Sequence, residues 1–122
     1  MGVEYILMIG FQVPPAHLEG LLASHPKVLD VAVIGLYSKS IASEVPRAYI
    51  VPAENPSHSL ASELIKFVHD RVAHYKRLRG GIVFIKAVPK SPSGKILRRV
   101  LKEEAKKDIG DPLITNQVRA RL

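Results

Sequence analysis

The chain has 122 residues and a mass of 13.4 kDa, which is the size of one ordinary domain. Its 47% hydrophobic and 24% charged residues exclude a disordered or collagen-like chain, and the absence of cysteine excludes disulfides, thiolate nucleophiles and cysteine-bound zinc. The 18 Lys and Arg residues outnumber the 11 Asp and Glu residues, and the formal charge of +7 favours an anionic partner: a nucleic acid, a phosphorylated small molecule, an acidic membrane or an acidic neighbouring domain.

The first half of the chain predicts a strand, a helix and two further strands. Residues 5–13 form an apolar, β-prone run that ends at Pro14-Pro15, where a short helix can begin because proline is tolerated in a first helical turn. That helix carries an apolar stripe at helical spacing and closes before Pro26. Two β-branched runs, residues 28–36 and 48–51, are expected as neighbouring strands joined by a polar loop over residues 37–47.

The second half of the chain predicts two helices separated by a strand and a loop. After a loop over residues 52–59, apolar residues at helical spacing predict the longest helix, over residues 60–75. Gly80-Gly81 is predicted to end this helix, and residues 82–85 form another β-branched run. Residues 88–95 are rich in turn formers and predict a loop, followed by an amphipathic helix that begins at Ile96 and has a basic polar face.

Together these elements predict an α+β domain with a small three-stranded central sheet and flanking helices, in the order β-α-β-β-α-β-α. We expect the domain to cover residues 1–108 and a tail to cover residues 109–122, where the sequence shows no clear period. No apolar run approaches the ~20 residues that a membrane helix needs, so no membrane span is expected.

One loop carries the strongest chemical signal. Residues 89–95 have the sequence Pro-Lys-Ser-Pro-Ser-Gly-Lys, and a lysine that ends a loop fixed by proline and glycine can be held as a point charge towards a phosphate. The loop is not a Walker A motif, because Pro89 stands where its first glycine is required and Ile96 where Ser or Thr would bind magnesium. From the residue pattern alone, a solvated surface loop is the alternative interpretation.

Further motifs run in a fixed order through residues 4–107. They are Gly10-Phe11-Gln12-Val13, Pro15-Ala16, Leu18-Glu19, Leu22, His25-Pro26, Val28, Asp30-Val31-Ala32-Val33-Ile34-Gly35, Pro46-Arg47-Ala48 and the segment from Pro89 to Arg99. In this order and spacing the chain resembles the C-terminal domain of the adenylate-forming (AMP-binding) enzymes, most closely that of acyl-CoA synthetases of the 4-coumarate-CoA ligase type.

The resemblance implies a two-step reaction that this chain would share with a large N-terminal domain. A carboxylic acid and Mg-ATP form an acyl-adenylate, and the thiol of CoA then attacks it to give a thioester and AMP. Lys95, preceded by Gly94, matches the lysine that the small domain supplies in the first step, where it would offset the charge of two anions brought together. The small domain is expected to rotate between the two steps. ATP and CoA are therefore expected as substrates of the complete enzyme, with no cofactor intrinsic to this chain.

For the second step, the resemblance assigns a CoA-facing role to the segment that contains Gly10, Phe11 and Gln12. Gly10 would let the backbone approach the pantetheine arm of CoA closely because it has no Cβ, and Gln12 matches a position implicated in thioester formation. The alternative for Phe11 and Val13 is packing of a strand against the core, since their spacing alternates as in a strand.

Three positions depart from the family pattern. Val3, Leu7 and Ile9 stand where the family typically has lysines, linked respectively to the hinge, to catalysis and nucleotide contact, and to CoA. A leucine cannot replace an ammonium group beside a phosphate, where a charge-assisted hydrogen bond is worth roughly 1.5–3 kcal/mol. Two hypotheses therefore stay open: a C-terminal ligase domain that is inactive without its large domain, and a noncatalytic binding or docking module that kept the fold and lost the chemistry.

Other site classes are not expected. The five histidines lack the His-Glu-x-x-His spacing of a zinc helix, so we expect no metal site and interpret them as surface or core residues. Nucleic acid is not an expected partner, because no aromatic-interleaved RNA motif or helix-turn-helix pattern accompanies the positive charge.

The C-terminal tripeptide suggests a cellular address. Ala120-Arg121-Leu122 resembles the Ser-Lys-Leu class of peroxisomal signal, which combines a small residue, a basic residue and leucine. We expect a peroxisomal location if this signal is used and a cytoplasmic one otherwise.

Overall fold

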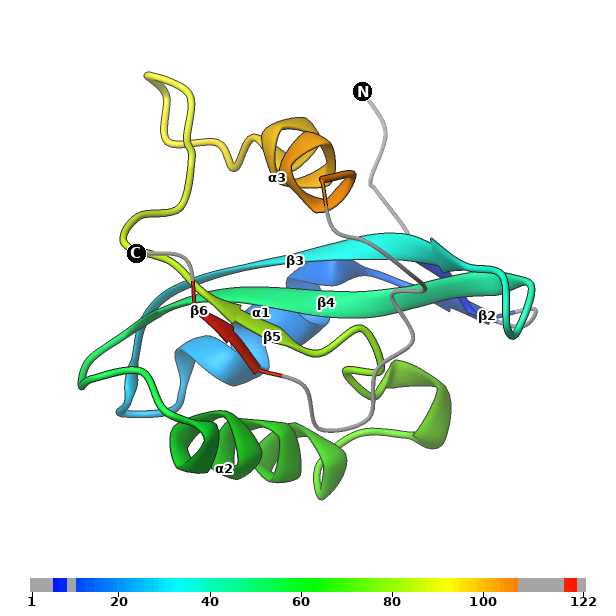
Figure 1. The fold of residues 1–122 in the computed structure, drawn as a ribbon, viewed down its shortest axis with the longest axis horizontal. Coiled ribbons are helices and arrows are strands. Elements are labelled where there is room, and N and C mark those ends of the chain that lie inside the picture. Colours follow the sequence, from blue (N-terminus) through cyan, green and yellow to red (C-terminus); the bar gives the residue numbers. More distant parts are fainter. Residues whose placement is uncertain (1–5, 9–10, 108–117, 121–122) are drawn as a thin grey trace.

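The computed structural model describes residues 6–8, 11–107 and 118–120. Its elements in chain order are β1 (Ile6–Met8), β2 (Phe11–Val13), α1 (Pro15–Ala23), β3 (Val28–Ser38), β4 (Ser43–Pro52), α2 (His58–His69), the 3-10 helix η1 (His74–Lys76), β5 (Ile82–Phe84), α3 (Arg98–Ala105) and β6 (Val118–Ala120). Figure 1 shows a layered α+β arrangement, with helices on both faces of one sheet. The predicted fold class is therefore confirmed.

The central sheet has the strand order β3-β4-β5-β6. Strands β3 and β4 form an antiparallel hairpin, whereas β5 runs parallel to β4 and β6 runs parallel to β5. Helix α2 connects β4 to β5, because two parallel neighbours need a crossover connection. The three expected strands thus lie side by side, and β6, inside the predicted tail, adds a short fourth strand that the sequence pattern did not indicate.

Alternate residues of the strands face two different apolar layers. On one face, α1 and α2 cover Val33, Ile50 and Phe84, and on the other face α3 covers Ile34 and the residues beside it. The second layer is smaller, because one short helix and the segment before it supply most of its cover. The layer beneath α1 and α2 is therefore the main core of the domain.

The apolar run at residues 5–13 forms two strands and not one. Strands β1 and β2 pair antiparallel, with Met8 opposite Phe11 and Ile6 opposite Val13. The prediction of a single strand was wrong. The apolar run contains Gly10 as its only turn former, and this weak signal was not enough to indicate two strands.

The polar loop expected over residues 37–47 is also much shorter in the structure. Strands β3 and β4 continue until Ser38 pairs with Ser43, which leaves residues 39–42 as the connection. Both serines are buried, and so is Arg47, whose side chain is 1% exposed. Polar residues predicted a loop here, but the strands extend through most of them and bury Ser38, Ser43 and Arg47.

Arg47 is held by the Gly80-Gly81 segment on the neighbouring part of the sheet. Its Nε donates to the Gly80 carbonyl at 2.8 Å, and the Gly80 N–H donates to the Pro46 carbonyl at 2.8 Å. A Cβ at position 80 would lie 2.8 Å from that carbonyl oxygen, so the close approach of the two backbones requires glycine. Gly80-Gly81 was predicted to end the preceding helix, which was wrong because that helix ends at His69; the two glycines instead allow the close packing of a buried guanidinium.

Helix α2 begins and ends earlier than the predicted range of residues 60–75. Ser57 caps it by accepting a hydrogen bond from the Leu60 N–H at 3.0 Å, and Asp70 ends it. Val72 still packs against the core from the turn that follows, which explains why its spacing extended the predicted helix. Helix α3 begins at Arg98, because Ile96 pairs with Lys90 in an antiparallel bridge. No helix in the described ranges is long and apolar enough to cross a membrane.

Candidate functional site

Residues 89–97 form a small hairpin, called hairpin 89–97 below, that extends away from the sheet between β5 and α3 (Figure 1). The Gly94 N–H donates to the Ser91 carbonyl at 2.8 Å, and the Ser91 N–H donates to the Lys95 carbonyl at 2.8 Å. Gly94 has a φ of +87°. These bonds are those of a three-residue loop in which a type I turn is followed by a left-handed residue, and the Ser-Pro-Ser-Gly sequence suits that turn.

Lys95 follows the turn and is exposed. Its backbone N–H donates to Ser91 Oγ at 3.2 Å, and Ser91 Oγ lies 2.9 Å from Ser93 Oγ, so the turn is braced by its own serines. The Lys95 ammonium pairs with no carboxylate among residues 13–107. The turn therefore presents the Lys95 ammonium group at the surface, where it can bind an anion.

Ion pairs hold both ends of hairpin 89–97. Lys90 Nζ lies 2.7 Å from Asp30 Oδ2, with about two fifths of each side chain exposed. After the hairpin, Arg98 binds Glu19 of α1 at 2.7 Å, and these side chains are 18% and 13% exposed. Glu19 was quoted in the sequence only as part of a motif, and its partner 79 residues away could not be inferred from spacing.

Strand β2, which contains two of the residues assigned to the CoA step, lies at the other end of the sheet from hairpin 89–97. The backbone of Phe11 and Gln12 forms β2, at the right-hand end of the sheet in Figure 1, whereas hairpin 89–97 extends at the left. Val13 is fully buried, which confirms core packing for that residue. Gly10 and the side chains of Phe11 and Gln12 lie outside the described residues, as do Val3, Ile9 and the side chain of Leu7. The structure therefore does not bring Lys95 and Gln12 together.

A third feature was missed by the sequence analysis: three basic side chains meet after α2. Arg77 Nη1 lies 3.2 Å from His74 Nδ1, and Arg79 Nη2 contacts the same imidazole. Within the described part of the chain no carboxylate pairs with these three groups, which we call the His74 cluster. Such a cluster favours binding of an anion such as a phosphate. The closely spaced basic residues at 74–79 are the signal that could have found it.

The His74 cluster predicts a measurable electrostatic effect. The nearby Arg79 guanidinium is the main cause that lowers the pKa of the His74 imidazole below its ordinary value of 6.5, with burial and Arg77 adding to it. We expect Arg79→Gln to move the His74 titration upwards, measured by NMR of the imidazole signals in the full chain. Added inorganic phosphate should also raise this pKa. A titration that neither change moves would contradict an anion-binding cluster.

The sign of the pH effect on stability follows from this lowered pKa. Because the folded state holds the His74 proton less tightly than the unfolded state, protonation favours unfolding. This contribution of His74 therefore opposes folding increasingly as the pH falls below 6.5, and it is absent well above that value.

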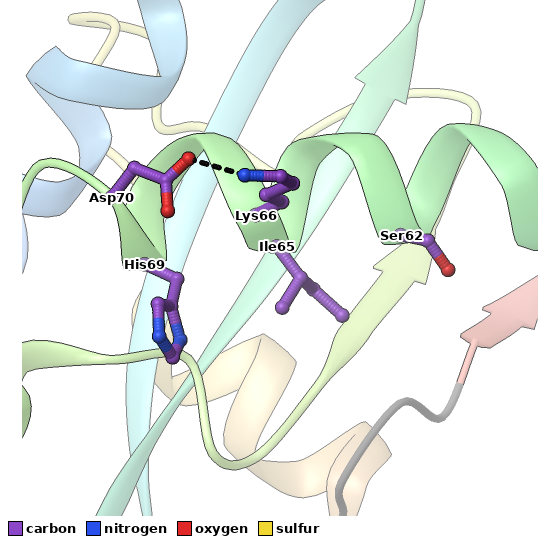
Figure 2. A pocket seen from close by; sticks show the side chains of 5 residues that line it. All are labelled: Ser62, Ile65, Lys66, His69 and Asp70. Carbon is purple, nitrogen blue, oxygen red and sulfur yellow. Dashed lines mark hydrogen bonds and ion pairs between the residues drawn. The ribbon is translucent and has the colours of Figure 1, made fainter.

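The outer face of α2 carries a shallow hollow that does not form a site. Figure 2 shows its lining residues, Ser62, Ile65, Lys66, His69 and Asp70, along one helix and its C-cap. Lys66 Nζ binds Asp70 Oδ2 at 2.7 Å, which is the main cause that lowers the pKa of the Asp70 carboxyl. The two charged side chains pair with each other, which leaves Ser62 and His69 as the polar groups of an open surface along one helix.

One of the five histidines is buried and four are exposed. His25 is buried, accepts from the Lys27 N–H at its Nδ1 and lies 3.2 Å from Glu63 through its Nε2. The other four, His17, His58, His69 and His74, are exposed. Within the described residues there is no group of three or more side chains suited to a metal ion.

The comparisons with known proteins agree with this geometry. The family profile of the AMP-binding enzyme C-terminal domain matches residues 17–95, and the chain belongs to this family. It is 53% identical over 100 residues to the probable 4-coumarate-CoA ligase 1 of Dictyostelium discoideum, with 82% of this chain and 18% of that protein covered. It is 47% identical over 102 residues to the phenylacetyl-CoA ligase epaB of Aspergillus niger, with 83% and 18% covered.

Solved structures of similar proteins have the same fold. The acyl-CoA synthetase of Brucella canis superposes with a TM-score of 0.77 at 31% identity, covering 85% of this chain and 19% of that one. The anthranilate-CoA ligase AuaEII, solved with anthranoyl-AMP, superposes with a TM-score of 0.76 at 32% identity, covering 85% and 19%. The chain thus spans about a fifth of the length of the relatives that it matches, and it corresponds to their C-terminal part.

Proposed function

We propose that this chain acts as the C-terminal domain of an acyl- or aryl-CoA ligase and completes the active site of a large N-terminal domain. The observation that carries the proposal is the separation of two candidate surfaces: an exposed lysine on hairpin 89–97 at one end of the sheet, and β2 at the other end. A small domain that rotates can present one end for adenylation and the other for thioester formation. Membership of the family supports this assignment.

In the first step, the carboxylate oxygen of the acid attacks the α-phosphorus of Mg-ATP, forms the acyl-phosphate bond and expels pyrophosphate. Negative charge is crowded between the carboxylate and the phosphate as they approach. The ammonium of Lys95 is proposed to lie beside both groups and to stabilise this charge electrostatically, without transferring a proton. Gly94 supports this role by allowing the tight turn that precedes the lysine.

In the second step, the CoA thiol loses its proton, attacks the acyl carbon and expels AMP. Gly10, Phe11 and Gln12 are proposed to face the pantetheine arm, with Gln12 acting in thioester formation. The His74 cluster offers a further place for an anion, and CoA carries phosphate groups. ATP and CoA are proposed as substrates of the complete enzyme, together with a carboxylic acid bound by the large domain.

A fusion protein tests this proposal. The large domain of the Dictyostelium discoideum relative, joined to this chain, should convert 4-coumarate, ATP and CoA to the thioester, because each half would supply what the other lacks. The large domain alone and this chain alone serve as controls and should give little product. A fusion that folds and binds ATP but forms neither adenylate nor thioester would contradict the proposal.

The alternative function is a noncatalytic docking module, and one observation favours it: Val3, Leu7 and Ile9 replace three lysines of the family pattern. Such a module would bind a ligase without completing its active site. Isothermal titration of the full chain with CoA and AMP distinguishes the two functions. Indifference to both nucleotides, combined with tight binding to a ligase, would favour the docking module.

We also propose a peroxisomal location wherever Ala120-Arg121-Leu122 forms the C-terminus of the protein. A fluorescent protein fused ahead of this chain should colocalise with a peroxisomal marker, and deletion of the tripeptide should return it to the cytoplasm. An identical diffuse distribution of both fusions would contradict the proposal.

A further inference from the structure

We infer that Glu19 and Asp30 are positioning residues for Lys95: they act through Arg98 and Lys90 to fix the direction in which hairpin 89–97 points. The inference rests on the proposed role of Lys95 in adenylate formation and extends it to two acidic side chains on other elements. Neither carboxylate pairs with Lys95, so both act through a second residue.

The hairpin has an internal structure but cannot set its own direction. Its legs are joined by the Leu97 N–H donating to the Pro89 carbonyl at 2.9 Å and by the bridge between Lys90 and Ile96. These bonds keep the loop in shape, yet they all lie within the hairpin. The direction of the Lys95 side chain relative to the sheet therefore depends on contacts at the base of the hairpin.

The incoming leg is attached to β3 through Asp30. The Asp30 Oδ2 binds Lys90 Nζ at 2.7 Å, while the Asp30 Oδ1 accepts a hydrogen bond from the Val31 N–H at 2.9 Å. The second bond orients the carboxylate, so the lysine meets an anion that is already fixed to the strand. The pair is partly exposed, which limits its strength.

The outgoing leg is attached more firmly through Glu19. Arg98 Nη2 donates to both Glu19 oxygens at 2.7 Å, and Arg98 Nε donates to the Val33 carbonyl at 3.3 Å. Glu19 Oε2 also accepts from the Val33 N–H at 2.8 Å. The carboxylate and the guanidinium therefore satisfy both backbone groups of one residue on the outer edge of β3, in a largely buried arrangement.

Both anchors thus lie along the same edge strand, at Asp30 and Val33, and Lys95 lies between the two anchored residues in sequence. Because the hairpin is short and internally hydrogen-bonded, a shift at either anchor displaces the ammonium group of Lys95. Misplacement of a reacting or stabilising group by about 1 Å can cost a hundredfold in rate. The two carboxylates therefore control how often the lysine meets its substrate in a productive position.

Steady-state and single-turnover kinetics of the fusion protein described above test this inference. We expect Glu19→Gln to lower kcat for adenylate formation about tenfold and Asp30→Asn about threefold, with KM for ATP and for the acid within twofold. Thioester formation from added acyl-adenylate should stay unchanged. Glu63→Gln is the matched control, because Glu63 pairs with Lys27 at 2.8 Å away from the hairpin and should leave both half-reactions unaltered.

A charge exchange separates positioning from a general structural effect. Lys90→Asp should lower adenylation, and the double variant Asp30→Lys with Lys90→Asp should regain at least half of the wild-type kcat. The Asp30 and Lys90 variants involve a partly exposed pair, so they remain folded even if Glu19→Gln does not. Hydrogen exchange of the Gly94 and Lys95 amides in the full 122-residue chain should quicken in Glu19→Gln and stay unchanged in Glu63→Gln.

The outcomes are distinguishable. If Lys95→Ala abolishes adenylation while Glu19→Gln and Asp30→Asn keep the wild-type kcat, the positioning role is wrong and the proposed function stands. If Lys95→Ala leaves adenylation unchanged, the proposed role of the lysine is wrong, and the positioning role is overturned with it. A fall in kcat for both carboxylate variants with rescue by the exchanged pair supports the inference.

Discussion

Replacing Lys95 by alanine in a fusion with a large ligase domain should lower the rate of acyl-adenylate formation by about a hundredfold to a thousandfold. Removing one group aimed at developing charge in an active site typically has an effect of this size. The side chain is exposed and is not part of the core, so the stability of the domain should not change. Single-turnover release of pyrophosphate measures the step directly.

The second half-reaction and a second lysine provide the controls for this variant. Thioester formation from added acyl-adenylate should stay within about threefold, because the lysine is proposed to act only while charge is crowded at the α-phosphate. Lys39→Ala, which removes an exposed lysine from the β3–β4 connection, should leave both steps unchanged. An equal loss in both half-reactions would mean that Lys95 supports the fold or substrate binding in general.

Replacing Leu64 by alanine should cost about 2–5 kcal/mol of unfolding free energy, the usual range for a leucine that leaves a cavity in a core. Leu64 lies in the middle of α2, is fully buried and belongs to the main core between the sheet and helices α1 and α2. Urea unfolding of the full chain, followed by circular dichroism, measures the change as a lower midpoint at an unaltered slope.

Leu29→Ala is the matched control, since the same substitution falls on a side chain that is 69% exposed on the edge strand β3. Its effect should be within about 0.5 kcal/mol, as for most surface substitutions. Equal destabilisation by the two variants would contradict the assignment of the main core to the face covered by α1 and α2.

The central elements of the fold were predictable because their signals are local. The stripe of leucines in α1, the helical spacing in α2 and the β-branched runs of β3 and β5 each indicate their own secondary structure. The turn at residues 91–94 was equally evident, because Pro92 and Gly94 suit the positions that they occupy.

The remaining features depend on partners that are distant in sequence. From the sequence alone Arg47 was expected in a loop, because its partner, the Gly80 carbonyl, lies 33 residues away. Likewise, only the tertiary contact with Arg98 links Glu19 to the hairpin. Strand β6 forms because β5 offers it an edge, not because of its own pattern. These contacts depend on the tertiary fold, so they cannot be inferred from the spacing of residues along the chain.

The candidate site was predictable only in part for the same reason. Lys95 stands out because proline, serine and glycine surround it, whereas the sequence analysis did not single out the basic residues at positions 74–79. The two arginines of the His74 cluster converge on one imidazole because the chain leaves α2 and turns through η1. The geometry therefore added a candidate anion site that the sequence analysis had not identified.

The most direct test of the account is the rate of ATP-pyrophosphate exchange, which reports adenylate formation alone. It should be measured with the same carboxylic acid for the large domain of the Dictyostelium discoideum relative by itself, and for that domain fused to this chain. We expect exchange by the fusion to be at least a hundredfold faster than by the large domain alone. Equal rates for the two proteins would contradict the claim that this chain completes an adenylate-forming active site.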